Sequence, residues 1–236
     1  MLWLWCSRWG MGQVASTRAS PRSAILRERS PCTSLPYRVT FARRDAPFES
    51  PNPRRLATTT LSAAEIDAPT WAPAGDKLAF SSKRPGDSQN QIYRMGVGDT
   101  VPTRLHPQSY VQRHPDWSPR GDWVAYDQEL STPKVWVYNT QTSQAVQLSQ
   151  GSNHDLMPVF EPHGQALAYV RSASGFHLRR MNLDASGDTQ VLANLCSTLP
   201  RSLRWTPDAD SLCFACNDSL FKVPQQGERA FTSISA

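Results

Sequence analysis

The stretch HPDWSPRGDWVAY, His114 to Tyr126, decides the fold of this 236-residue chain because it recurs. Three other segments repeat its order of an aromatic anchor, Pro two positions later, a small turn residue and an apolar-small-aromatic ending. The four copies are Pro69–Phe80, Pro115–Tyr126, Pro158–Tyr169 and Leu203–Phe214. Their anchors lie 46, 43 and 45 residues apart. The chain is therefore built on a repeat of about 45 residues.

The motif predicts a strand, a tight turn and a second strand. Trp117 ends the first strand, and residues 118–121 have the composition of a type I turn, with Pro at the second position and Gly at the fourth. The next strand alternates, with Val124 and Tyr126 on one face and the small Ala125 on the other. A large face and a small face suit a sheet that is packed between neighbouring sheets on both sides. In the last copy Ala209 replaces the turn glycine, so we expect that turn to differ.

Two further short strands follow each copy of the motif. The third strands are expected in QIYRM, VWVYN, FHLRRMN and SLFKV, and the fourth in PTRL, AVQL and TQVL. Four short strands per repeat predict an all-β β-propeller of four-stranded antiparallel blades. A β-sandwich does not require such a period and is less favoured.

Part of an earlier repeat precedes the four copies of the motif. Residues 37–44 and 52–59 have the pattern of the two outer strands of an earlier blade, so about four and a half blades are visible. We expect a partial propeller over residues 37–236 and a disordered or non-native segment over residues 1–36. Open blade faces would then favour self-association.

The repeats resemble those of the TolB-like propellers, whose signature is close to P-x-W-S-P-D-G-x-x-I/L-A-F. The aspartate before the glycine is kept only as Asp208. The resemblance implies six blades, so the four and a half visible here would be an incomplete propeller. It also implies a bacterial envelope or periplasmic setting and a non-catalytic module that binds a protein or peptide. It also leaves open the propeller part of a serine peptidase-like protein, or the sensor domain of a transcriptional regulator.

Composition excludes several other classes. The net charge of +5 comes from residues 1–60, which carry +7, while residues 61–236 carry −2, so the basic pI is no evidence of a nucleic-acid face on the folded part. No stretch approaches the roughly 18 apolar residues of a membrane span. The apolar run at the N-terminus is too short for a clear signal peptide.

The sequence predicts no enzyme, cofactor or metal site. It contains no G-x-S-x-G nucleophile elbow and no metal-ligand spacing among its five histidines. The five cysteines have no framework spacing, and we expect them in strand cores, with Cys213 and Cys216 on opposite faces of one strand. Candidates for partner binding are Tyr110, His114, Asp155 and Arg201, which are expected just before inner strands, where propeller ligands gather.

Overall fold

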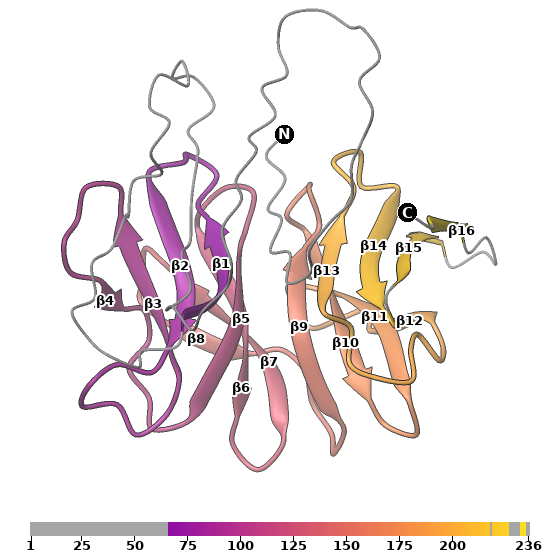
Figure 1. Cartoon of the computed structure of the whole chain (residues 1–236), viewed down its shortest axis with the longest axis horizontal. Helices are drawn as coiled ribbons and strands as arrows, with labels where there is room; N and C mark the ends of the chain where they lie inside the picture. The colour runs from indigo at the N-terminus through magenta and orange to yellow at the C-terminus, as the bar shows by residue number, and fades with distance from the viewer. Residues whose placement is uncertain (1–65, 218, 227–231, 235–236) are drawn as a thin grey trace, which may run out of the picture.

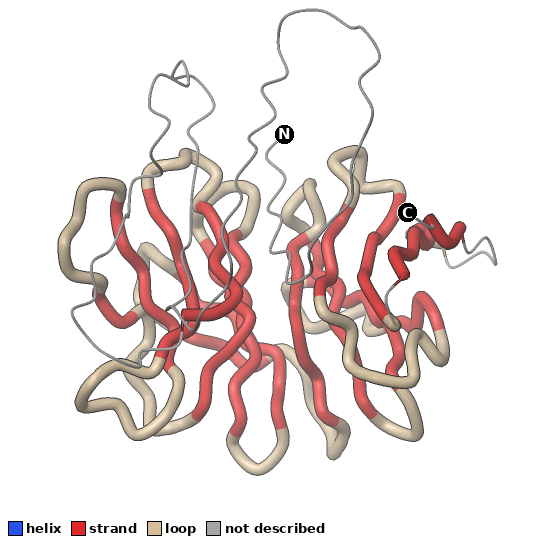
Figure 2. Tube along the Cα trace, viewed as in Figure 1, coloured by secondary structure: helices blue, strands red, loops and turns tan. Residues whose placement is uncertain are grey.

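The computed structural model describes residues 66–217, 219–226 and 232–234, which form sixteen strands and no helix (Figures 1 and 2). Blade 1 contains β1 (Ile66–Trp71), β2 (Lys77–Ser82), β3 (Gln91–Gly96) and β4 (Thr103–Arg104). Blade 2 contains β5 (Val111–Trp117), β6 (Trp123–Glu129), β7 (Pro133–Asn139) and β8 (Ala145–Gln147). Blade 3 contains β9 (His154–Phe160), β10 (Ala166–Ser172), β11 (Phe176–Asn182) and β12 (Thr189–Leu192). Blade 4 contains β13 (Ser202–Trp205), β14 (Ser211–Cys216), β15 (Ser219–Pro224) and β16 (Thr232–Ile234).

Each blade is one antiparallel sheet whose strands are hydrogen-bonded in chain order. This confirms the predicted all-β propeller of four-stranded blades, and Figure 1 shows the four sheets fanned side by side. The first strand of each blade is its inner strand, and β1 contacts β5, β5 contacts β9, and β9 contacts β13. Four blades lie within the described residues. The predicted earlier half blade and residues 1–36 lie outside them, so the domain boundaries stay predictions.

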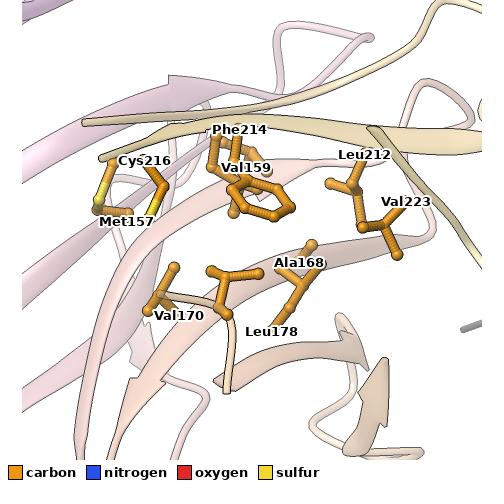
Figure 3. Close-up of a cluster of buried hydrophobic side chains, with 11 residues drawn as sticks. Met157, Val159, Ala168, Val170, Leu178, Leu212, Phe214, Cys216 and Val223 are labelled. Atoms are coloured by element: carbon orange, nitrogen blue, oxygen red, sulfur yellow. The ribbon is translucent and has the colours of Figure 1, made fainter. Parts of the chain in front are cut away.

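The blades pack through the alternation that the motif predicts. Ala79 of blade 1 packs against Val124 and Tyr126 of blade 2, and all three are fully buried. Blades 2 and 3 repeat this arrangement, and the largest cluster lies between blades 3 and 4, where Ala168 contacts the layer containing Phe214 (Figure 3). The small residue of one blade thus leaves room for the large residues of the next.

All four motif turns close in the same way. The N–H of Gly121 donates to the carbonyl oxygen of Ser118 over 2.9 Å, and Gly121 has a φ of +76°. The expectation that the last turn differs is wrong. The N–H of Ala209 donates to Thr206 over 2.9 Å, and Ala209 adopts a φ of +63°. The hairpin geometry requires a left-handed residue there, and Ala209 takes it against its own preference.

The turns also contact each other between blades. A Cβ added to Gly121 would lie 3.3 Å from Cγ of Pro73 in blade 1. A Cβ added to Gly164 of blade 3 would lie 3.4 Å from Cδ of Pro119 in blade 2. The proline of each of these turns therefore packs on the glycine of the following turn, where a side chain would crowd it.

The cysteines are only partly as expected. Cys216 is buried in the core between blades 3 and 4, while Cys213 on the same strand is a free thiol outside that cluster. However, Cys216 forms a disulfide with Cys196, with Cα atoms 6.2 Å apart. The spacing gave no sign of this pair, because the connection between β12 and β13 carries Cys196 back to the end of β14.

Candidate functional site

The inner strands of blades 1 to 3 each contain a strained residue near the middle. Ala68, His114 and Met157 have φ values of +48°, +49° and +54°, in the left-handed region that residues with side chains rarely adopt. Each lies three positions before its aromatic anchor and directly before the proline that opens the motif. Residues held in this region cluster at functional sites, so the three positions are candidates for one.

The motif proline explains the strain. In β5, residues 114 and 115 together lie opposite Tyr126, because Arg113 pairs with Asp127 and Asp116 pairs with Ala125. Proline has no N–H to donate to the ladder, so the strand forms a β-bulge at this point. Strands β1 and β9 have the same irregularity.

Blade 4 provides the control for this explanation. Its motif opens with Leu203 in place of proline, and β13 pairs with β14 without interruption from Ser202 to Trp205. No residue of β13 has a positive φ. The bulge therefore follows the proline and not the propeller geometry as such.

The bulges surround a cavity of about 140 Å³. Residues from all four inner strands or the segments next to them line this cavity, which we call the central cavity: Asp67, Ala68, His114, Pro115, Met157, Pro158, Val159, Arg201, Ser202, Leu203 and Arg204. This is smaller than the roughly 300–1,000 Å³ of ordinary small-molecule sites. Its size fits one small chemical group.

One carboxylate fixes two of the bulges. Oδ1 of Asp127, on β6, lies 2.6 Å from Nδ1 of His114 and accepts a hydrogen bond of 3.1 Å from the backbone N–H of Met157. Burial favours the neutral imidazole, but the charge of Asp127 and its hydrogen bond outweigh this and raise the pKa of His114. Asp67 adds to the rise, and Arg113 opposes it. The imidazolium is thus stabilised at the cavity wall.

A second buried carboxylate, that of Asp116, lies on β5 two residues after His114. Asp116 accepts a hydrogen bond of 2.8 Å from the N–H of Phe160 and one of 3.4 Å from Oγ1 of Thr70. Burial raises the pKa of Asp116, and the positive charge of Arg204 is the largest of the effects that oppose this. Asp116 therefore connects the inner strands of blades 1 to 3.

The exposed part of the wall is charged. Arg201 and Arg204 come from the start of blade 4, and Asp67 comes from β1. Nη1 of Arg204 donates to the carbonyl oxygen of Leu203 over 2.8 Å, and Oδ1 of Asp67 accepts from the N–H of Ala68 over 2.7 Å.

The four predicted binding residues do not form one group. His114 and Arg201 both line the central cavity. Tyr110 is exposed outside it, and its carbonyl oxygen accepts a hydrogen bond from Gln91. Asp155 is completely buried and pairs with Arg171 through contacts of 2.6 and 3.0 Å. Their role in binding stays a prediction, and the structure gives Asp155 a structural ion pair.

The expected positions along the strands also need correction. His114 lies inside β5 and Asp155 inside β9, and not before these strands as the sequence suggested. Sequence reasoning missed Arg204 and the two carboxylates Asp116 and Asp127. The motif proline was the available signal, because an X-Pro pair within a strand pattern indicates a bulge.

A second hollow, of about 410 Å³, lies at the loops of blade 3 and is lined by Ser152, Asn153, His154, Ser172, Ala173 and Ser174. It is open and involves one blade only. Across the described residues, no three His, Cys, Asp or Glu side chains are grouped as metal ligands. Over the same residues, no helix has the length and hydropathy that a membrane crossing requires.

The repeated sheets and their converging inner strands define a β-propeller. The TolB beta propeller domain family matches residues 48–227, and the chain belongs to this family. A structure of a putative TolB from Agrobacterium tumefaciens superposes with a TM-score of 0.66 at 15% identity, over 79% of this chain and 70% of that one.

Two curated proteins are similar in sequence. An uncharacterized protein of Agrobacterium fabrum is 23% identical over 155 residues, which are 61% of this chain and 52% of that protein. An uncharacterized peptidase of Bacillus subtilis is 25% identical over 107 residues, which are 42% of this chain and 16% of the peptidase. The chain thus spans about half the length of the first relative and a small part of the second.

Proposed function

We propose that the chain is a non-catalytic propeller module that binds a protein or peptide partner at the central cavity. The observation that carries this proposal is the convergence of four blades on one cavity whose wall contains three strained backbone positions. Strained residues persist where the surrounding structure holds them, and they gather at binding sites. The small cavity volume supports a peptide anchor and not a cofactor.

The envelope setting is part of the same proposal. The disulfide between Cys196 and Cys216 supports an oxidising compartment, where such bonds persist. A periplasmic or extracellular module that presents a cavity to a protein partner agrees with this feature.

The test is a binding selection with a cavity-blocking variant. A random peptide phage library is panned on the purified chain, and the selected peptides are measured against Ser202→Trp and Thr142→Trp. Ser202 is an exposed residue of the cavity wall, and Thr142 is exposed in the turn between β7 and β8. We expect Ser202→Trp to abolish binding and Thr142→Trp to leave it unchanged. Equal binding by both variants would place the partner elsewhere.

A second candidate is the propeller part of a peptidase, which the partial similarity to the Bacillus subtilis peptidase favours. Such a part would bind peptide substrates and have no turnover of its own. The two candidates differ in what the bound peptide is, so they are separated by whether the bound peptides are cleaved by a peptidase that contains this propeller.

A further inference from the structure

We infer that the central cavity takes a single carboxylate of the bound peptide, and that Arg201 and Arg204 are the specificity-determining residues that recognise it. The carboxylate can come from the peptide C-terminus or from an Asp or Glu side chain. This inference rests on the proposed function, since it names the chemistry of the group that enters the same cavity.

The first argument is size. A cavity of about 140 Å³ excludes a folded element or a drug-sized molecule. It has room for one side-chain head or one chain end. The occupant must therefore be recognised through a few contacts with the wall, and the charge of the wall decides which group is favoured.

The second argument concerns the acidic residues of the site. Asp127 accepts from His114 and from the Met157 N–H. Asp116 accepts from the Phe160 N–H and from Thr70. These two carboxylates hold the bulged strands together, so they are committed to the fold and are poor sites for a cationic ligand.

The third argument concerns the basic residues. A guanidinium has five N–H donors in a planar fork that matches a carboxylate. Arg201 and Arg204 are both exposed on the cavity wall, three residues apart at the start of blade 4. His114 adds a third donor-bearing side chain, about one quarter exposed. The raised pKa of His114 increases the share of the imidazolium form at the wall.

Asp67 supplies the opposing charge and also a decisive test. It is exposed on the same cavity wall, on β1. A bound carboxylate would be repelled by Asp67, and a bound ammonium group would be attracted. The two ligand classes therefore predict opposite effects of removing this one charge.

The experiment uses peptides selected on the unaltered chain, each made in matched forms: acidic residue or amide isostere, and free or amidated C-terminus. Affinities are measured for the unaltered chain and for Arg204→Gln, Arg201→Gln, Asp67→Asn and Arg120→Gln. Arg120 is an exposed arginine of the turn between β5 and β6, and its variant is the matched control.

We expect one acidic group of each peptide to be required. Neutralising it should weaken binding by about tenfold or more, the scale of a charge-assisted hydrogen bond. Arg204→Gln and Arg201→Gln should weaken the acidic form similarly and leave the amide form unchanged. Asp67→Asn should strengthen the acidic form, and Arg120→Gln should have no effect. The peptide form that responds identifies a chain end or a side chain as the source.

Peptides that bind and are blocked by Ser202→Trp, but whose acid and amide forms bind equally, would overturn this inference and leave the proposed function intact. Weaker binding to Asp67→Asn would overturn it in favour of a cationic group. A library without a single binder would count against the proposed function itself.

Discussion

Oδ1 of Asp127 lies 2.6 Å from Nδ1 of His114, so a strained residue of β5 is held by its own blade. The same oxygen accepts the N–H of Met157 in blade 3. One buried carboxylate thus stabilises two neighbouring bulges, one through an imidazole and one through the backbone.

The His114–Asp127 pair predicts a pH-dependent stability. Because the pKa of His114 is raised above the ordinary value of 6.5, its contribution is complete below that value and is lost as the pH rises through the folded-state pKa. Urea unfolding from about pH 5.5 to 9 should show stability falling over this window. His114→Gln should flatten the profile, and the exposed His163→Gln should not. A profile for His114→Gln that is parallel to that of the unaltered chain would refute the assignment.

Asp116 predicts a difference between two substitutions. Asp116→Ala leaves the N–H of Phe160 without its acceptor and should lower the free energy of unfolding by about 1–3 kcal/mol. Asp116→Asn keeps an acceptor and removes a buried charge whose pKa burial already raises, so it should cost less. Asp76→Ala, at an exposed surface pair, is the control. Equal losses for the alanine and asparagine variants of Asp116 would contradict this account.

The left-handed turn residue in blade 4 predicts a stabilising substitution. Ala209 has a φ of +63°, which costs a residue with a Cβ about 1 kcal/mol relative to glycine. Ala209→Gly should therefore raise the free energy of unfolding, measured by urea titration. The converse change, Gly121→Ala, should lower it, because it adds the same strain and a contact with Pro73. If Ala209→Gly is destabilising, packing of the buried methyl group outweighs the backbone effect.

The disulfide predicts a redox-dependent stability. Cys196 and Cys216 close a loop of 20 residues, which in the chain-entropy description contributes about 3 kcal/mol. Cys196→Ala should lose about that much, and dithiothreitol should bring the unaltered chain to the same value without affecting the variant. Cys213→Ser removes a free thiol and should leave the redox response intact. A chain whose stability is unchanged by reduction would show that the pair is not bonded in solution.

The repeat made most of the fold predictable, because both its hydrophobic alternation and its turn are local patterns. Trp117, Ala125 and Tyr126 occupy the strand positions that the motif assigned to them. The central cavity was less predictable, since it depends on which side chains of different blades meet, as Asp116 does with Phe160, 44 residues further along the chain. His114 and Arg201 were identified from their places in the repeat, whereas Arg204 and Asp127 become visible only when the inner strands are brought together.

The disulfide between Cys196 and Cys216 was not predictable from the sequence for a different reason. Cys196 lies in a connection without repeat character, and its approach to Cys216 depends on the path of that connection over blade 3.

Self-association through the outer blade faces stays a prediction. Leu220 on β15 of the last described blade is 40% exposed, and light scattering on the purified chain would measure whether such faces associate.

The contacts of Pro73 with Gly121 and of Pro119 with Gly164 run in one direction along the chain, from the proline of one blade to the glycine of the next. The turn of blade 2 contains both contacts within three residues: Pro119 packs on the glycine of the next blade, and Gly121 accepts the proline of the preceding blade. A tandem duplication of one such unit therefore yields a copy that already fits both neighbours, with no compensating change required. An insertion or deletion of part of a unit would leave a proline without the glycine it packs on, so we expect propellers of this kind to change length by whole blades.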